Sequence, residues 1–563
     1  MNLFNKIQIV IPMSGFGERF RKAGYSIPKP LIEVDGKPII AHVIDLFPGE
    51  SDFLFICNNE HLANSAYRLK EILNQYCPTG RIVGIPSHKL GPVYAICQVE
   101  DMIDSDRPII VNYCDFTCYW NWQHFKEFIS ATECIGAIPG YKGFHPHSLG
   151  STNYAYMREE KGWVIDIQEK KPFTDSRMQE YASSGTYYFA TGGVMKSAFH
   201  EAMEKELKIS GEYYVSLTYK PLLEKKYPVV VYPIQHFMQW GTPEDLKEYN
   251  GWSETFRRLI DPQVPRLPSQ GAVIIPMAGL GQRFMDEGYK IIKPLILVSG
   301  KPMVVQATRD LPPATHHVFV LRHDMPGQKG LVSTLKKIYP NAIIKDLLKV
   351  TDGQACTALI GLDSLEQTLN IDFSDPITIG ACDNGVLYNH DSFQKLINNP
   401  DIDIIVWGSR GHANALRYPQ MFGWIDAQNG QIRQISVKKE LNSPALDPIV
   451  IGTFTFRCAT VLRHAVQHLF EREGRINGEF YLDSCINDAI ELGLNCHLFE
   501  VDNFLSWGTP NDLRTFEYWQ SCFHKWPGHP YRLEKDGRIA TSSLGQLNDS
   551  YRPFVPSPQN MHG

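Results

Sequence analysis

Continuous apolar runs, each followed by a stretch of helical character, recur along the chain. They lie at residues 6–13, 52–59, 80–86 and 107–114, and again at 271–277, 316–323, 342–348 and 375–382. Runs without polar alternation are typical of strands buried on both faces, and their alternation with helices favours a mainly parallel sheet. The pattern therefore predicts an α/β fold in which ligands bind beyond the carboxyl ends of the strands.

The chain also repeats itself once. Residues 8–40 align without a gap with residues 272–304, and both stretches contain a glycine-rich loop and the motif K-P-L. Later landmarks keep nearly the same spacing: Asp115 corresponds to Asp383, Lys170 to Lys438, Gly185 to Gly452 and Trp240 to Trp507. Self-similarity over such a length predicts two copies of one domain.

The repeat sets the expected domain boundaries. The first domain is predicted at 1–255, a linker at 256–270 and the second domain at 271–520. Three prolines and no apolar periodicity mark the linker. Residues 521–563 are polar and proline-rich towards their end, which predicts a loosely packed extension.

Composition narrows the class of protein. The 563 residues are 43% hydrophobic and 21% charged, the balance of a folded protein, and the formal charge is −6. No basic block is present, so nucleic acid is not expected as the partner. Twelve cysteines without a C-x-x-C pair favour a reduced, cytoplasmic protein. The apolar run at the N-terminus is too short to span a bilayer, and no membrane span is predicted.

A glycine-rich loop follows the first predicted strand of each copy. Its two glycines let backbone N–H groups approach phosphate oxygens, and a helix N-terminus after the loop favours negative charge. Arg19 and Arg283 follow these loops and are suited to hold a polyphosphate bidentately. A single loop of this kind is equally compatible with a tight turn and a surface arginine. The candidate nucleotide-binding residues are Met13, Ser14, Gly15, Gly17, Met277, Ala278, Gly279 and Gly281.

Two further motifs follow each loop in the same order. K-P-L begins at Lys29 and Lys293, and G-K-P contains Lys37 and Lys301. The succession G-x-G-x-R-F, K-P-L and G-K-P resembles the opening signature of the sugar-nucleotidyltransferase family, which includes sugar-1-phosphate nucleotidylyltransferases and choline-phosphate cytidylyltransferases. The resemblance covers nearly all of both copies. For Lys37 and Lys301 we prefer the alternative of solvated turn lysines.

This resemblance implies two tandem Rossmann-like α/β/α nucleotidyltransferase domains with mostly parallel central sheets. It also implies that Arg19, Arg283, Lys29 and Lys293 are catalytic residues that bind a nucleoside triphosphate and neutralise its developing charge. Gly91 and Gly353, each just before a predicted helix, are similar to the family's glycine that lies against the nucleobase. A plain helix N-terminus is the alternative for both.

A carboxylate follows a predicted strand in each copy. Asp115 and Asp383 stand where a triphosphate is expected, and a carboxylate there is a natural Mg²⁺ ligand. Both resemble the family's metal-binding Asp, although Asp is also favoured in turns. Many relatives carry a second metal-binding Asp two positions before the glycine of W-G-T-P. Gln239 and Ser506 occupy that place here, and neither is anionic.

The acceptor side is expected around a second lysine. Lys170 and Lys438 resemble the lysine of the family's E-K-P segment, which meets the acceptor phosphate, although a solvated charge run remains open. Gly185, Glu212, Gly452 and Glu479 would line the acceptor pocket by the same resemblance.

These residues favour one reaction. A phosphate oxygen of the acceptor attacks the α-phosphorus of a nucleoside triphosphate and releases pyrophosphate. The predicted partners are a nucleoside triphosphate, Mg²⁺ and a phosphorylated small molecule, either a sugar 1-phosphate or a phosphorylated polar alcohol. Both halves active, one half regulatory, and a nucleotide- or sugar-binding protein without turnover all remain open. So do the nucleobase, the acceptor and the choice between monomer and homo-oligomer. A role in surface polysaccharide precursors is what the resemblance implies.

Overall fold

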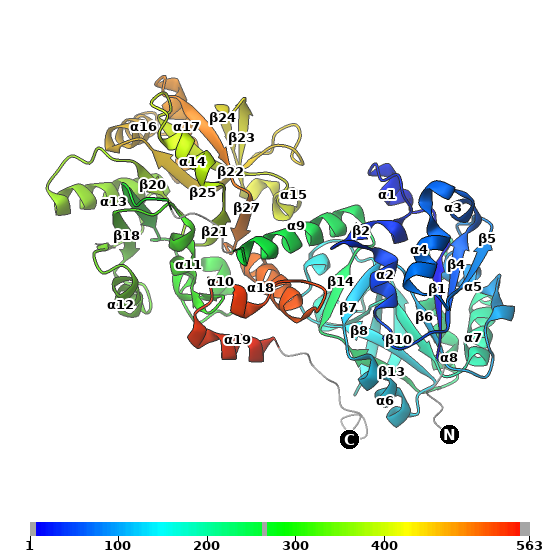
Figure 1. Ribbon diagram of the computed structural model, residues 1–563. Helices are drawn as coiled ribbons and strands as arrows, with labels where there is room; N and C mark the ends of the chain where they lie inside the picture. Colours follow the sequence, from blue (N-terminus) through cyan, green and yellow to red (C-terminus); the bar gives the residue numbers. More distant parts are fainter. Residues whose placement is uncertain (1–6, 262–266, 552–563) are drawn as a thin grey trace. The chain divides into compact units, whose positions relative to one another are not determined.

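The computed structural model describes residues 7–261 and 267–551 (Figure 1). They form two compact units. Unit 1 contains residues 7–254 together with 521–530 and 550–551, and unit 2 contains residues 255–520 together with 531–549. All eight predicted strands are present, four in each unit.

Unit 1 is built on one large sheet. Its ten strands lie in the order β11 (Tyr181–Ser183), β9 (Ala155–Glu160), β10 (Trp163–Glu169), β13 (Val229–Pro233), β8 (Gly136–Tyr141), β12 (Thr186–Phe189), β6 (Ile109–Asn112), β1 (Gln8–Met13), β4 (Phe53–Asn58) and β5 (Arg81–Ile85). The apolar runs of β1, β4 and β6, rich in β-branched and aromatic residues, suit strands covered on both faces, and all their side chains except Pro12 are buried.

Unit 2 repeats this arrangement with nine strands. Their order is β19 (Ile343–Leu347), β18 (His316–Arg322), β15 (Ala272–Pro276), β20 (Ile377–Ile379), β25 (Ile449–Phe456), β22 (Ile404–Ser409), β26 (Cys496–Glu500), β24 (Gln431–Val437) and β23 (Gly423–Gln428). The long strand β25 takes the places of both β12 and β11 of unit 1. The two sheets therefore have the same topology.

The expected mostly parallel sheet is found only in part. Strands β5, β4, β1 and β6 form a continuous parallel run, as do β19, β18, β15 and β20. Next to each run lies an antiparallel strand, β12 or β25, and the far edge is antiparallel as well. The sheets are mixed because short connections fold β9, β10 and β23, β24 back as hairpins, which need no crossover helix.

Helices cover both faces of each sheet (Figure 1). In unit 1, α5 (Pro92–Cys97), α7 (Gly192–Glu204) and α8 (Tyr219–Glu224) pack on one face. The other face carries α6 (Trp122–Thr132), whose Phe125 contacts Tyr188 and Tyr232. In unit 2, α13 (Gln354–Leu369), α16 (Ala459–Glu471) and α17 (Leu482–Glu491) lie opposite α11 (Met303–Asp310), α12 (Gln328–Ile338) and α14 (His390–Ile397).

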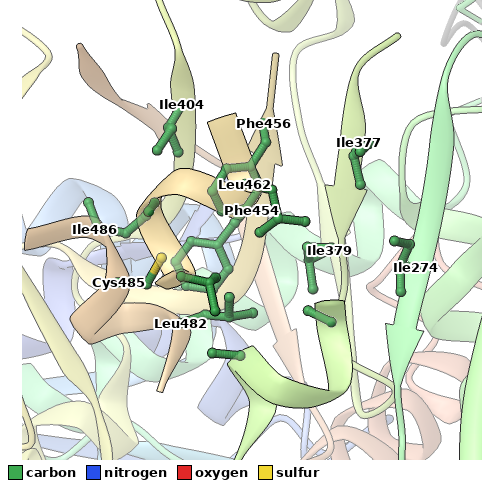
Figure 2. Close-up of a cluster of buried hydrophobic side chains, with 14 of the residues drawn as sticks. Ile274, Ile377, Ile379, Ile404, Phe454, Phe456, Leu462, Leu482, Cys485 and Ile486 are labelled. Atoms are coloured by element: carbon green, nitrogen blue, oxygen red, sulfur yellow. The ribbon is translucent and has the colours of Figure 1, made fainter. Parts of the chain in front are cut away.

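The core of unit 2 is the apolar layer under α16 and α17 (Figure 2). Phe454 and Phe456 of β25 are fully buried there with Leu462 of α16 and Ile486 of α17. Burying each such side chain contributes roughly 1.5–3 kcal/mol. Phe454 and Phe456 are two positions apart on β25 and therefore point to the same face of the sheet. That face is continuously apolar towards the helices, and polar loops are left to the ends of the strands.

The chain after residue 520 departs from the expected loose extension. Tyr531 and Leu533 are buried in unit 2, Arg538 pairs with the buried carboxylate of Asp310, and Gln306 donates to the Arg538 carbonyl. Residues 552–563 lie outside the described part. The predicted linker also starts inside a helix, since α9 runs over Pro243–Leu259. No helix in the described residues is long and apolar enough to cross a membrane.

Candidate active site

The strand-end carboxylate and the K-P-L lysine meet in both units. Lys29 Nζ donates to Asp115 Oδ2 at 2.8 Å, and Lys293 Nζ donates to Asp383 Oδ2 at 2.5 Å. The lysines stand in the short 3₁₀ helices η2 (Lys29–Leu31) and η8 (Lys293–Leu295), and the carboxylates follow β6 and β20. Sequence analysis placed these residues at one site but did not predict that they form an ion pair.

The lysines of these ion pairs keep their positive charge. Burial disfavours the ammonium form of Lys29, but the neighbouring carboxylate of Asp115 outweighs it, so the pKa of Lys29 lies above its usual value. Lys293 has a raised pKa for the same reason, against the same cost of burial. Each unit therefore holds a lysine that stays positively charged at neutral pH next to an aspartate at the sheet edge.

A two-stranded ladder brings W-G-T-P to the same place. Strand β14 (His236–Gln239) pairs with β7 (Phe116–Tyr119), and β27 (Asn503–Ser506) pairs with β21 (Asn384–Leu387). The backbone N–H of Trp240 donates to the Asp115 carbonyl at 2.9 Å, and Trp507 repeats this bond with Asp383. A Cβ added to Gly241 would lie 3.0 Å from Asp115 Oδ2. The motif is a packed turn that also closes one side of the carboxylate.

The Asp115 and Asp383 carboxylates at this turn are suitable ligands for a magnesium ion, although one carboxylate makes a weak site by itself. Gln239 and Asp115 both line the space that the missing side chain of Gly241 leaves open, and Ser506 and Asp383 line that of Gly508. Unit 2 thus offers one carboxylate and the Ser506 hydroxyl oxygen, whereas in unit 1 the amide nitrogen of Gln239 is the atom that lies beside the Asp115 carboxylate. Mg²⁺ usually binds one or two carboxylates plus substrate phosphates and waters.

The glycine loops lie beside the lysines. Gly17 and Gly281 have φ of 63° and 67°, which only glycine adopts without strain, and a Cβ on Gly281 would lie 3.3 Å from Lys293 Cβ. In unit 2 the loop is held by a residue that sequence analysis missed: Arg322 donates from Nη1 to the carbonyls of Ala278 at 2.9 Å and Gly279 at 3.1 Å.

The loop arginines are available for a ligand. Arg19 and Arg283 are exposed on the short helices α1 (Glu18–Lys22) and α10 (Gln282–Asp286), and neither forms an ion pair within the described residues. By contrast, Lys37 pairs with Asp45 at the surface, in keeping with a solvated turn lysine. The two arginines are therefore the unneutralised cations of the glycine loops.

Gly91 and Gly353 have a structural reason to be glycine. Gly91 has φ of 87° and Gly353 of 130°, and a Cβ on Gly353 would lie 2.6 Å from Phe480 N. The backbone of the G-E-F-Y segment crosses here, where Phe480 N donates to the Asp352 carbonyl at 2.7 Å. Unit 1 repeats the crossing between Tyr213 and Leu90. The glycine thus allows a neighbouring backbone segment to pass close by. Neither hypothesis from the sequence, a nucleobase contact or a plain helix N-terminus, included this role.

This crossing gives a stability prediction. Gly353→Ala is expected to destabilise unit 2 by about 2–4 kcal/mol, because the new methyl group meets rigid backbone and an L-residue is strained at this φ. Gly330→Ala is the matched control: it lies in α12, its added Cβ meets nothing within 4 Å, and alanine favours helix. The measurement is thermal unfolding. Equal melting temperatures for the two variants would contradict the close approach.

The acceptor-side lysines have the same partner in both units. Lys170 Nζ donates to Tyr214 OH at 2.6 Å, and Lys438 Nζ donates to Tyr481 OH at 2.7 Å. Both lysines adopt the left-handed conformation, with φ of 58°. The charge of Arg19 also acts on Tyr214, which places the glycine loop of unit 1 within electrostatic reach of the acceptor side. The lysines are held by tyrosines and are not a freely solvated charge run.

The four remaining acceptor candidates are not equivalent. Glu212 accepts a hydrogen bond from Tyr214 OH at 2.5 Å, whereas Glu479 is exposed and its side chain makes no hydrogen bond among the described residues. Gly185 approaches the ring of Tyr113, and Gly452 approaches Ala381 instead. The two units therefore differ most on the acceptor side.

Sequence analysis missed the buried acid of unit 1. Glu169, at the end of β10, is 8% exposed, and its Oε2 accepts a hydrogen bond from Ser216 Oγ at 2.5 Å. Burial raises the pKa of Glu169 from 4.5 to about 7, although Ser216 and Lys170 act in the opposite direction. A buried carboxyl group next to a lysine is a feature of functional sites.

This raised pKa predicts a pH-dependent stability. Between pH 4.5 and 7 the folded protein keeps a proton on Glu169 that the unfolded chain has lost, so stability falls as pH rises through this range. Glu169→Gln removes this titrating group. Its free energy of unfolding is expected to exceed that of the wild type by about 3 kcal/mol at pH 8 and to equal it below pH 4.5. Urea unfolding across this pH range measures the difference, with the exposed Glu160→Gln as control. A constant difference would contradict the shift.

The first half of the chain is similar to known proteins. Residues 9–250 match the family model described as nucleotidyl transferase. Two similar proteins are the mannose-1-phosphate guanylyltransferase catalytic subunit beta of Dictyostelium discoideum, 26% identical over 174 residues, and a mannose-1-phosphate guanyltransferase of Neurospora crassa, 28% identical over 147 residues. These matches cover 29% and 26% of this chain and 45% and 40% of the relatives, so the chain spans less than half the length of each.

Solved structures are similar as well. A nucleoside-diphosphate-sugar pyrophosphorylase from Vibrio cholerae has a TM-score of 0.36 and 20% identity, over 43% of this chain and 98% of that one. A UDP-glucose pyrophosphorylase in complex with UDP-glucose has a TM-score of 0.35 and 15% identity, over 45% and 99%. By its match to the family model, the stretch from residue 9 to residue 250 is similar to the nucleotidyl transferases. The two relatives are, by name, enzymes that act on mannose 1-phosphate.

Proposed function

We propose that both units transfer a nucleoside monophosphate from a nucleoside triphosphate to a phosphorylated small molecule and release pyrophosphate. The observation that carries this proposal is the recurrence, in both units, of one polar set at the carboxyl ends of the strands. Each set holds a lysine–aspartate pair, an unpaired arginine on the glycine loop and an acceptor-side lysine. A protein that only binds nucleotides has no chemical need for all of them twice.

The reaction requires that the two substrates be positioned and that the negative charge of their phosphates be neutralised. An oxygen of the acceptor phosphate attacks the α-phosphorus, the bond from that phosphorus to the bridging oxygen breaks, and its electron pair leaves with pyrophosphate. Arg19 and Lys29 in unit 1 would stabilise the charge that gathers on the leaving group, as Arg283 and Lys293 would in unit 2. No covalent intermediate is required, so no nucleophilic side chain is needed.

The acceptor-side lysine aligns the attacking group. Lys170 or Lys438, held by its tyrosine, would bind the acceptor phosphate and lower the entropy cost of bringing two anions together. Asp115 and Asp383 are the residues that would hold Mg²⁺, with Gln239 and Ser506 beside them. When bound, such an ion neutralises phosphate charge. The glycine loops would bring backbone N–H groups to the triphosphate.

The finer identity of the substrates is part of the proposal. The relatives that match the first half act, by name, on mannose 1-phosphate, which supports a sugar 1-phosphate as one acceptor. We propose a cytoplasmic role in supplying activated precursors for surface polysaccharides. The alternative is a nucleotide- or sugar-binding regulatory protein with one or both halves inactive, and the neutral Gln239 and Ser506 favour it.

Pyrophosphate release decides between these functions. The purified protein is incubated with Mg²⁺, each of CTP, UTP, dTTP, GTP and ATP, and mannose 1-phosphate, glucose 1-phosphate, phosphocholine or phosphoethanolamine. Release that requires one acceptor and one nucleotide is the expected result. If a nucleotide raises the melting temperature but no pyrophosphate is released, the protein binds nucleotides without turnover and the proposed enzymatic function is wrong.

A further inference from the structure

The two units carry their acceptor-side acid on different elements. In unit 1 the residue before Lys170 is Glu169, whereas in unit 2 the residue before Lys438 is Val437. The acid missing from unit 2 reappears after the tyrosine: the segment G-E-Y-Y-V-S ends in Ser216, and its counterpart G-E-F-Y-L-D ends in Asp483. Ser216 is the residue that donates a hydrogen bond to Glu169, so the acid of unit 2 stands at the position of the unit 1 donor.

A third difference makes room for the relocated acid. In unit 1, Ala155 of β9 pairs with Glu169, and in unit 2, Gly423 of β23 pairs with Val437 at the equivalent register. A Cβ on Gly423 would lie 3.2 Å from Asp483 Cγ and still closer to its Oδ2. The glycine therefore accommodates the carboxylate, and the three substitutions belong together: alanine to glycine, glutamate to valine, and serine to aspartate.

The carboxylate of Asp483 is not used by the protein. Among the described residues it accepts a hydrogen bond only from its own backbone amide, and the charge of Lys438 acts on it. Burial raises the pKa of Asp483 to about 6, so the carboxyl group is mostly ionised at neutral pH. A partly buried carboxylate whose only donor is its own backbone amide loses much of the stabilisation that water or a ligand supplies.

The space around the acid also differs between the units. In unit 1 the ring of Tyr113 lies against Gly185, and its hydroxyl accepts a hydrogen bond from Val215 N at 3.2 Å. Unit 2 has Ala381 at the position of Tyr113, two residues before the strand-end aspartate. Unit 1 thus satisfies its acid with a side-chain donor and has an aromatic ring beside it. Unit 2 has no side-chain donor to its acid among the described residues, and only a methyl group stands at the position of that ring.

We propose that Asp483 is the specificity-determining residue of unit 2, where its carboxylate accepts a hydrogen bond from the acceptor whose phosphate Lys438 binds. This inference rests on the proposed function. It implies that the two units take different acceptors, and that the acceptor of unit 2 carries a hydrogen-bond donor close to its phosphate. A sugar hydroxyl and a primary ammonium group share this chemistry, and phosphocholine, which has neither, does not.

The test measures steady-state pyrophosphate release in an Asp115→Ala background, which removes the contribution of unit 1. The acceptors are mannose 1-phosphate, glucose 1-phosphate, phosphoethanolamine and phosphocholine. Asp483→Asn, which keeps the side-chain shape, is expected to raise the acceptor KM at least about 10-fold, a loss typical of a charged hydrogen bond, with the nucleotide KM unchanged. Asp426→Asn, an exposed acid on the same β23, is the matched control.

The arms separate the sources of the donor. An effect confined to the sugar phosphates identifies a hydroxyl, and one confined to phosphoethanolamine identifies an ammonium group; either supports the inference. An acceptor KM that is the same in Asp483→Asn and in the background protein overturns it while leaving the proposed function intact. A preference for phosphocholine over phosphoethanolamine overturns it as well.

If unit 2 does not turn over, binding of the same four acceptors is measured by calorimetric titration of the Asp115→Ala protein with and without Asp483→Asn. Absence of turnover would contradict the proposed function of unit 2, and the inference is then decided by binding. Heat of binding that disappears in Asp483→Asn supports it, and heat that is equal or absent in both proteins overturns it. The double variant Val437→Glu with Asp483→Ser, which restores the arrangement of unit 1, is expected to lose the same binding while keeping an acid beside Lys438.

Discussion

Asp115→Ala is expected to lower turnover by unit 1 about 1000-fold, and Asp383→Ala is expected to do the same for unit 2 alone, as the loss of a group that stabilises transition-state charge does elsewhere. Each substitution removes the carboxylate at the sheet edge and leaves a partly buried lysine without its counter-ion. If the units take different acceptors, each variant abolishes pyrophosphate release with one acceptor and preserves it with the other.

The two variants together assign the activities. Full loss in Asp115→Ala alone would mean that unit 2 does not turn over, and full loss in Asp383→Ala alone would mean the reverse. Asp45→Ala is the control, because Asp45 also pairs with a lysine but lies at the surface, 61% exposed. Activity retained in the double variant Asp115→Ala, Asp383→Ala would place the chemistry elsewhere and contradict the proposed mechanism.

The repeated fold could be predicted from the sequence because its strands are long, continuous apolar runs. β1 and β15 both read as uninterrupted β-branched sequence and are buried on both faces, so burial and pattern agree. The antiparallel strands β12 and β25 could not be predicted. Strand direction depends on which neighbours the chain reaches after a long excursion, and a short apolar run carries no information about it.

The candidate site was predicted in its residue types but not in its pairings. Lys29 and Asp115 are 86 positions apart, and nothing in either motif indicates that the two side chains bond to each other. Gly91 was assigned to the nucleobase, yet the crossing backbone of Tyr213 already requires a glycine there. A base contact at this glycine stays a prediction, since both demands can act on one position.

The difference between the acceptor sides shows what internal comparison adds. The loss of Glu169 in the second copy reads, in sequence alone, as a weakened motif. In the structure, Gly423 of β23 pairs with Val437 of β24, which stands at the position of Glu169. Asp483, from another element, places its carboxylate beside Gly423, where a larger residue would clash with it. A sequence motif describes residues that are adjacent in the chain, whereas the acceptor side is formed by residues that are adjacent in the folded structure.

Lys29→Met is expected to lower kcat/KM of unit 1 about 100- to 1000-fold, and Lys293→Met that of unit 2. Methionine keeps most of the side-chain volume but removes the ammonium group, so the leaving pyrophosphate loses a fixed cation and Asp115 loses its partner. Lys37→Met is the matched control in the same unit, because Lys37 pairs only at the surface. The readouts are kcat/KM for the nucleotide and inhibition by pyrophosphate.

The pair is expected to act as one element. If Lys29 serves partly by holding Asp115, the double variant Lys29→Met, Asp115→Ala should be little worse than Asp115→Ala alone, because residues in direct contact are not additive. Losses that multiply would show that the lysine and the carboxylate act independently on the two phosphates. A kcat/KM for Lys29→Met within twofold of wild type would remove the lysine from the mechanism and leave Arg19 as the cation that the leaving group meets.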